Sequence, residues 1–422
     1  MDQELAIWNA AVPVRPAAVR LCDDTGEVIG AVRQASTDRL PLSVLGGGHD
    51  WAGRSVRPGG LVIDLRGMRT VEIDGAVATI GGGATAADLI AAAARTGQSA
   101  ATGTVGAVGM AGLTLGGGYG PLCGVAGLAA DNLLSADIVL ADGTVVTAGD
   151  SSQPDLFWAL RGGGGNFGAV TSMRVRLYPI PLVYGGTIVF PFTQAADVLT
   201  GFGELIESAP DDLTAQSGII SGPDGTPMLF INPTWAGPGG AGPGWIKEIE
   251  NLGEPIMSSV GRTGYGEPLR RGDELFARDG RHYAIRTCNL ARLTAETAAA
   301  IVTAGAARTS PFSAISLHHF HGAATRVPLP DTAFGIRQQH FMVEIVASWW
   351  PGNNDDGLHR QWADTSADRL RPFALPGGYP NLLTADRREQ TAYAYGPNAG
   401  RLTVVKERYD PDGVFTATPL PV

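Results

Sequence analysis

The first 180 residues alternate short β-branched runs, glycine clusters and alanine-rich stretches. The runs 61–65 and 78–80 predict strands, and the segment 85–95 predicts a helix that Thr85 caps at its N-terminus. Segment 137–147 reads as two strands around an Asp-Gly turn. This part of the chain is therefore expected to mix helices and strands.

After Pro181 the pattern changes to longer alternating strands and amphipathic helices. Residues 186–190 and 339–348 predict strands, and 194–208 predicts a helix. The Pro- and Gly-rich segment 237–244 predicts a surface loop. We expect a second domain here, with an antiparallel sheet covered by helices.

The last stretch, from about Gly378, is expected to return to the first domain and to end in a helix over 398–409, which Asp410-Pro411 terminates. The predicted fold class is α+β with two domains. The expected boundaries are 1–180 for the first domain, 181–377 for the second and 378–422 for the returning segment.

Composition narrows the class of protein. The 422 residues carry 31 Lys and Arg against 41 Asp and Glu, a net charge of −10, and no basic cluster. Phosphate backbones need such clusters, so nucleic acid is not an expected partner. A hydrophobic share of 44% with only 17% charged residues argues against disorder. With no signal-like start and no long apolar tract, the sequence predicts a cytoplasmic protein without a membrane partner.

Cysteine and histidine spacing gives no metal site. Three cysteines without ligand spacing predict neither a disulfide framework nor zinc, so redox chemistry would need an organic cofactor. The run His318-His-Phe-His321 is expected to split across a strand, with His318 on one side and His319 and His321 on the other. No further ligand of suitable spacing is evident, and no metal is predicted.

Fifty-nine glycines gather in clusters between apolar segments. The cluster 81–83 follows a strand and opens a helix, which formally fits a dinucleotide fingerprint. However, no Asp or Glu occurs between Asp88 and Asp131, where a ribose-binding acid would stand. A tight strand–helix turn is the better interpretation.

The cluster Gly46-Gly-Gly-His49 differs, because a β-run enters three glycines whose N–H groups could form an anion nest beside the histidine. From this segment alone, a loop histidine satisfied by local contacts remains the simpler alternative. The segments 112–120 and 161–168 supply two more backbone-rich loops. Three such loops with few charges suit a large, flat ligand with one diphosphate, for which FAD is the candidate.

Taken together, GGGHDWAG, GTVGAVGMAGLTLGGGYG, GLAADN, DLFWALRGGGGNFGAVT and YGPNAGRLTVVKERYDPDGVF resemble the FAD-linked oxidases of the vanillyl-alcohol oxidase superfamily, in the berberine bridge enzyme-like branch. The resemblance is strong over about residues 33–180 and 378–420. It implies an FAD domain, a separate substrate domain, and hydride transfer from a small organic molecule to flavin N5 followed by reoxidation with dioxygen to hydrogen peroxide.

The resemblance implies a single covalent flavin link, from His49 to the 8α-methyl group. Gly46, Gly47, Gly48 and Asp50 would hold the diphosphate, although Leu45 stands where relatives have arginine. Val105 occupies the place of a second, cysteinyl tether, and Val108 the oxygen-access position. Cys123 reads as a small buried residue. The other residues that the resemblance places at the cofactor are Gly112, Gly116, Gly117, Gly120, Asn132, Asn166, Gly168, Val170, Tyr395 and Asn398.

For catalysis, Tyr379 and Asn381 match an active-site element whose second tyrosine is Leu382 here. On the strand 339–348 a period of two places His340, Glu344 and Ser348 on one face. Glu344 could act as a base if that face looks at the flavin, and a solvated face is the alternative.

The expected activity is oxidation of an amine or of an alcohol of a natural product. A sugar or oligosaccharide oxidase, or a flavin- or ligand-binding protein without turnover, are the alternatives. The expected partners are a small-molecule substrate and dioxygen, with a homodimer possible.

Overall fold

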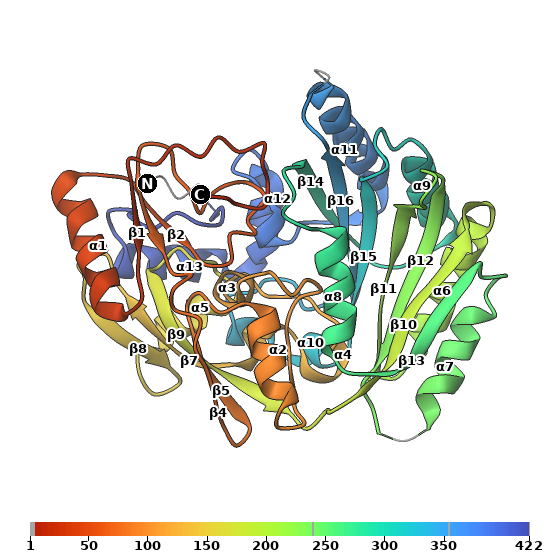
Figure 1. Ribbon diagram of the computed structural model, residues 1–422, viewed down its shortest axis with the longest axis horizontal. Coiled ribbons are helices and arrows are strands. Elements are labelled where there is room, and N and C mark those ends of the chain that lie inside the picture. The colour runs from red at the N-terminus through yellow and green to blue at the C-terminus, as the bar shows by residue number, and fades with distance from the viewer. Residues whose placement is uncertain (1–4, 239, 353–354, 422) are drawn as a thin grey trace.

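The computed structural model describes residues 5–238, 240–352 and 355–421, and it divides into two units (Figure 1). In the first unit, a parallel three-stranded sheet has the order β1-β3-β2. Its strands are β1 (Ala18–Leu21), β2 (Leu42–Leu45) and β3 (Leu61–Asp64). Helix α1 (Thr25–Asp38) packs on it. Asp24 caps the N-terminus of this helix, because its carboxylate accepts the N–H of Glu27 at 2.9 Å.

The second sheet of this unit is antiparallel, with the order β4-β5-β9-β7-β8 and β6 paired to β9. Its strands are β4 (Val71–Asp74), β5 (Val77–Gly81), β6 (Ser99–Ala100), β7 (Leu133–Val139), β8 (Val145–Gly149) and β9 (Ala169–Tyr178). Around it lie α2 (Ala86–Ala94), α3 (Met110–Leu115), α4 (Cys123–Ala126) and α5 (Pro154–Leu160). Thr85 caps α2 as the sequence predicts.

The glycines at 81–83 serve close packing of backbone. Strand β5 pairs antiparallel on both sides, so no parallel dinucleotide-binding sheet is built on them. A Cβ on Gly82 would lie 2.2 Å from Val170 O, and one on Gly83 would lie 1.8 Å from Leu65 O. This agrees with the interpretation of a tight strand–helix turn.

The second unit is built on an eight-stranded antiparallel sheet with the order β13-β10-β12-β11-β15-β16-β14-β17. Its strands are β10 (Val183–Pro191), β11 (Leu213–Ser221), β12 (Pro227–Trp235), β13 (Met257–Thr263), β14 (His282–Leu290), β15 (Ala314–Phe320), β16 (His340–Trp349) and β17 (Ala374–Leu375).

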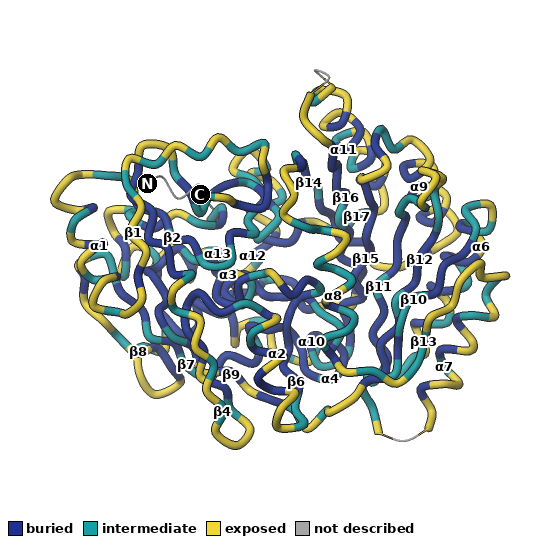
Figure 2. The backbone as a smooth tube through the Cα atoms, viewed as in Figure 1, coloured by how far each residue is buried: buried dark blue, intermediate teal, exposed yellow. Residues whose placement is uncertain are grey.

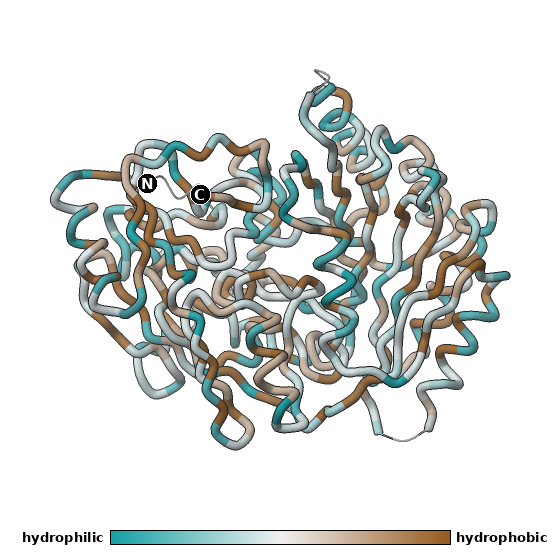
Figure 3. Tube along the Cα trace, in the orientation of Figure 1, coloured by the Kyte–Doolittle hydropathy of each residue, from teal (hydrophilic) through white to brown (hydrophobic). Residues whose placement is uncertain are grey.

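Four helices cover the outer face of this sheet (Figure 1). They are α6 (Ala195–Glu207), α7 (Ala241–Glu250), α9 (Ala295–Ala306) and α11 (Asp356–Leu370), and they share one apolar core with the sheet. The central strands β15 and β16 are mostly buried, whereas the edge strand β13 and the outer sides of these helices are largely exposed (Figure 2). The outer sides of the helices also carry many hydrophilic residues (Figure 3). The opposite face of the sheet is turned to the first unit.

One sequence expectation is wrong in part. The Pro- and Gly-rich segment 237–244 was predicted as a loop, but α7 begins at Ala241 within it. Pro243 is tolerated because the N–H groups of a first helical turn have no helical partner. Gly242 then packs directly against the Trp235 ring.

The chain returns to the first unit after β17, through α12 (Arg388–Tyr395) and α13 (Ala399–Tyr409). Lys406 on α13 donates its Nζ to Asn166 O and to Phe415 O, each at 2.7 Å, and pairs with Asp410. Two short helices of the second unit, α8 (Gly266–Leu275) and α10 (Ala323–Arg326), also lie against the first unit. In the described part of the chain, no helix has the length and apolar character to cross a membrane.

Candidate functional site

A large cavity runs between the two units. Its first-unit wall consists of the loop after β2, the loop 103–109, helix α3 and residues 165–170. Its second-unit wall consists of β14, β15 and β16, and residues 379–382 and 415–418 close it from the C-terminal segment. Most of the lining is backbone and apolar side chain, which suits a large and mostly uncharged ligand.

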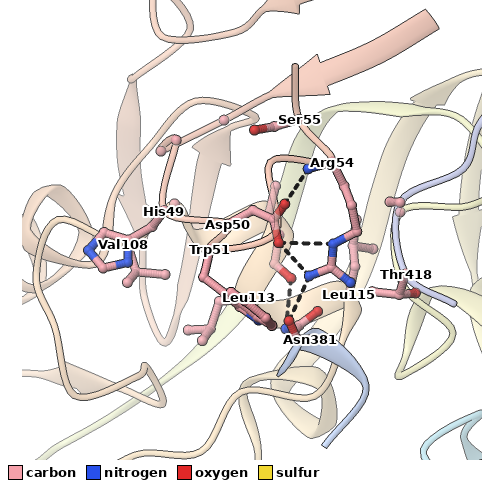
Figure 4. Close-up of a pocket in the computed structure, with 18 of the residues that line it drawn as sticks. His49, Asp50, Trp51, Arg54, Ser55, Val108, Leu113, Leu115, Asn381 and Thr418 are labelled. Carbon is pink, nitrogen blue, oxygen red and sulfur yellow. Dashed lines mark hydrogen bonds and ion pairs between the residues drawn. The ribbon is translucent and has the colours of Figure 1, made fainter. Parts of the chain in front are cut away.

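The predicted glycine loop lines this cavity (Figure 4). Gly47 and Gly109 approach so closely that a Cβ on Gly47 would lie 2.3 Å from the backbone N of Gly109. Gly48 has a φ of +71°, which favours glycine. The loop thus presents bare backbone to the cavity from two sides, as an anion nest requires.

His49 follows this loop and lies at the cavity wall. Its Nε2 is buried and has no hydrogen-bond partner among the described residues. The imidazole stacks on the Trp8 ring with centroids 4.5 Å apart and planes at 15°. Burial, and then the nearby Arg278 guanidinium, lower the His49 pKa to about 4, so the ring is neutral at pH 7. A neutral, oriented imidazole nitrogen without a partner fits attachment to a flavin.

The residues present therefore fit FAD. The backbone of Gly46, Gly47 and Gly48 would face the diphosphate, and His49 Nε2 would face the flavin ring system. Val105, Val108, Gly112, Gly168 and Val170 also line the cavity. Arg278 donates Nη2 to Gly47 O at 2.8 Å, so a positive charge stands near the loop despite Leu45. The sequence pattern had no signal for Arg278, because it comes from the second unit.

Asp50 also lines the cavity, and its carboxylate pairs with Arg54 (Figure 4). Arg54 in turn donates Nη2 to Asn381 O at 2.7 Å and Nη1 to Leu383 O at 3.2 Å. Trp51 Nε1 donates to Leu382 O at 3.1 Å. These contacts fix the returning C-terminal segment to the glycine loop, a role of Arg54 that sequence analysis missed.

We expect Arg54→Met to destabilise this junction. The substitution removes charge-assisted hydrogen bonds to two carbonyls and takes the ion-pair partner from a mostly buried Asp50 carboxylate, a loss of about 2 kcal/mol. Thermal unfolding monitored by circular dichroism should show the lowered stability. The matched control is Arg292→Met, which breaks an exposed pair with Glu207 and should cost less. Equal shifts in both variants would contradict the bracing role.

Tyr379 and Asn381 meet at the cavity. The Tyr379 hydroxyl oxygen accepts the N–H of Gly118 at 3.0 Å and the Asn381 Nδ2 at 3.1 Å. Burial raises the Tyr379 pKa to about 12, against the lowering effect of these two donors. The phenol thus stays protonated, and its own hydrogen can be directed toward a ligand. Asn381 orients the hydroxyl and also donates to Gly112 O at 3.3 Å.

The face of β16 that carries Glu344 looks into the cavity, so the alternative of a solvated face is excluded. Met342, Glu344 and Val346 all line it, as a period of two requires. Glu344 Oε2 lies 3.5 Å from His318 Nε2 on the neighbouring strand β15. Its side chain is 22% exposed. A carboxylate and an imidazole therefore lie side by side on the second-unit wall of the cavity.

A second polar pair, Tyr119 and His340, was not predicted. The carbonyl of Gln338 can only accept, so His340 Nδ1 carries the hydrogen in their 2.8 Å contact. Burial lowers the His340 pKa to about 4, so the ring is neutral and its Nε2 accepts the Tyr119 hydroxyl hydrogen at 2.8 Å. The Tyr119 oxygen keeps its lone pairs for a ligand, and the ring packs edge-on against Tyr379 with centroids 5.0 Å apart.

Three glycines expected at the cofactor lie behind the cavity wall. A Cβ on Gly116 would lie 2.1 Å from Asn381 Oδ1, and one on Gly117 would meet the Phe334 ring at 2.9 Å. A Cβ on Gly120 would lie 1.9 Å from Thr102 O. Gly116 and Gly117 permit close packing against Asn381, Phe334 and Tyr379, whereas Gly120 packs against the backbone of Thr102. None of the three lines this cavity.

Four predicted polar residues also lie outside the cavity lining, because each is committed to backbone or to another side chain. Asn132 donates to Ala126 O and Leu128 O, both at 2.8 Å. Asn166 donates to Gly163 O at 2.8 Å, and Tyr395 donates to Pro419 O at 3.1 Å. Asn398 donates to Leu329 O at 2.9 Å. The structure assigns them to holding loops in place.

The remaining candidates behave as ordinary buried groups. Cys123 packs in an apolar cluster with Leu128 and Phe320, and burial raises its pKa to about 12. His319 and His321 stack at 3.8 Å on the side of β15 opposite to His318. Over the described ranges, the structure gathers no three His, Cys, Asp or Glu residues that could hold a metal ion.

Comparison with known proteins agrees with this geometry. Residues 16–149 match the FAD binding domain family, and residues 378–419 match the family described as berberine and berberine like. The chain is 31% identical over 97% of its length to the FAD-linked oxidoreductase aurO of Gibberella zeae, of which it covers 81%. It is 30% identical over 97% of its length to (R)-6-hydroxynicotine oxidase of Paenarthrobacter nicotinovorans, of which it covers 92%.

Solved structures give the same result. The 6-hydroxy-D-nicotine oxidase of Arthrobacter nicotinovorans superposes with a TM-score of 0.88 at 29% identity, covering 98% of this chain and 93% of that one. Xylooligosaccharide oxidase from Myceliophthora thermophila, solved with xylobiose, gives 0.84 at 25% identity, covering 99% and 94%. Fold and site thus define an FAD-dependent oxidoreductase. The chain belongs to the berberine bridge enzyme-like FAD-linked oxidoreductases, and the predicted two-domain α+β fold is confirmed.

Proposed function

We propose that this protein is an FAD-dependent oxidase with the cofactor attached once, through His49. FAD supplies the acceptor for a hydride from substrate carbon and is reoxidised by dioxygen to give hydrogen peroxide. The observation that carries this proposal is the convergence of three groups on one cavity. These are the unpartnered His49 Nε2, the Tyr379 hydroxyl and the Glu344 carboxylate.

The chain's own residues supply binding and proton transfer. Glu344 is the general base, because its carboxylate accepts protons and opens to the cavity beside His318. Tyr379 is the positioning group, since its raised pKa keeps it a donor near neutral pH. Asn381 fixes its direction through the 3.1 Å hydrogen bond. The apolar side chains Met342, Val346 and Leu382 form the substrate wall.

The proposed substrate is a small molecule with an oxidisable C–N or C–O bond. Relatives named as a nicotine oxidase and a xylooligosaccharide oxidase support both the amine and the hydroxyl class. The test is anaerobic addition of amines, alcohols and sugars to the flavin-loaded protein while the flavin absorbance is followed. Bleaching by one class identifies it. A protein that none of them bleaches would favour a flavin-binding role without turnover.

Tyr379→Phe should slow flavin reduction by at least about tenfold. This effect is smaller than the loss of a group that transfers a proton, because Tyr379 is proposed to position the substrate. The phenylalanine keeps the ring packing against Tyr119 and loses only the hydroxyl. Rapid-mixing reduction kinetics measure the effect. The covalent flavin should remain, and an unchanged rate would remove Tyr379 from the active site.

A further inference from the structure

A second, smaller cavity adjoins the first on the inner face of the eight-stranded sheet. The two cavities share Thr104, Tyr119 and His318 as lining residues, so they are contiguous. The floor of the second cavity comes from β10, β11 and β12, and helix α8 bounds it on one side. A molecule that reacts beside Glu344 and extends past His318 would enter it.

The strand register places a row of polar side chains along this path. Asn232 on β12 pairs with Gln216 on β11, and Gln216 pairs with His318 on β15. His318 in turn lies 3.5 Å from Glu344. Paired residues on adjacent strands lie on the same face of a sheet. The polar side chains therefore follow one another across the sheet toward the proposed base, in the order Asn232, Gln216, His318 and Glu344.

Both donors and acceptors are available in this second cavity. The Oδ1 of Asn232 is buried and has no hydrogen-bond partner among the described residues. Such an acceptor is costly unless a ligand or water donates to it. The Thr187 oxygen already accepts Arg271 Nη1 at 2.7 Å, so the Thr187 hydroxyl can donate its own hydrogen onward.

This combination selects the chemistry of the ligand. A hydroxyl group both donates and accepts, so it can satisfy Asn232 Oδ1 and the Thr187 hydroxyl together. A carboxylate has no hydrogen to offer Asn232, and a cation would face the Arg271 guanidinium. We infer that the second cavity binds a neutral, hydroxyl-bearing part of the substrate, such as a sugar ring or polyol, while the first cavity holds the carbon that reacts. This inference rests on the proposed function.

The test uses the flavin-loaded protein under anaerobic conditions with glucose, cellobiose and xylobiose as probes. The half-saturating concentration is read from perturbation or reduction of the flavin spectrum. Asn232→Leu and the nearly isosteric Thr187→Val should each raise it at least about tenfold, the effect of losing one hydrogen bond. The maximal spectral change or reduction rate should stay within about twofold. Asn251→Leu, on the exposed end of α7, is the matched control and should change neither value.

Circular dichroism and flavin content establish that each variant is folded. Absence of binding by all three neutral sugars, equal affinities in wild type and both cavity variants, or tighter binding of glucuronate than of glucose would each overturn the inference. Bleaching by an amine or a simple alcohol in the same protein would leave the proposed oxidase function standing. The two conclusions can therefore fail separately.

Discussion

Denatured His49→Ala protein should lack the mass of one FAD that denatured wild-type protein carries. The imidazole is the group that we propose to bond the cofactor, and its Nε2 is buried, neutral and unpartnered at the cavity wall. An alanine removes the ring nitrogen that we propose forms the bond, while the backbone nest at 46–48 stays intact. We therefore expect FAD to bind without covalent attachment and to leave the protein on denaturation, as intact-mass measurement would show.

Cys123→Ser is the matched control for this experiment. The thiol is the other side chain near the glycine-rich segments with attachment chemistry, but its pKa of about 12 keeps it protonated and a thiolate is the reactive form. It also packs away from the cavity, against Leu128 and Phe320. The serine variant should keep the full FAD increment. Loss of the increment in Cys123→Ser, or its persistence in His49→Ala, would falsify the single histidyl link.

Glu344→Gln should slow flavin reduction by about 10²–10⁴-fold, the usual contribution of a general base. Glutamine keeps the size of the side chain and its place beside His318 but cannot accept a proton. The limiting rate from rapid mixing with the bleaching substrate should fall, whereas the half-saturating concentration should change little.

The control for charge removal is Glu204→Gln on the exposed side of α6, which should reduce at the wild-type rate. A Glu344→Gln rate within about threefold of wild type would move the base role elsewhere. Tyr119, which lines the same cavity and whose hydroxyl contacts His340 Nε2, would then be the next residue to substitute. A Tyr119→Phe variant would decide between the two.

The pattern of hydrophobic and polar residues along the chain was enough to locate several strands and helices of this protein. The hydrophobic periodicity predicted β10, β16 and α6 within a few residues, because side-chain alternation depends on neighbours along the chain. The parity of residues on β16 placed His340 and Glu344 on one face, and the ordered glycine motifs located the cofactor loop. The loop predicted over 237–244 was too long, because α7 already begins at Ala241. In the sequence alone Pro243 indicates a residue that interrupts a helix, although proline is tolerated in a first helical turn.

Tertiary structure decided which of these residues reach the cavity. The motif that contains Gly112 also contains Gly116, Gly117 and Gly120. These three glycines pack against Asn381, Phe334 and Thr102, respectively. Whether Glu344 faced water or a ligand depended on the first unit covering that side of the sheet. Arg54, Arg278 and the Tyr119–His340 pair escaped prediction, because their partners lie on segments distant in sequence. Spacing along a chain specifies which face a side chain takes, and only folding specifies what that face meets.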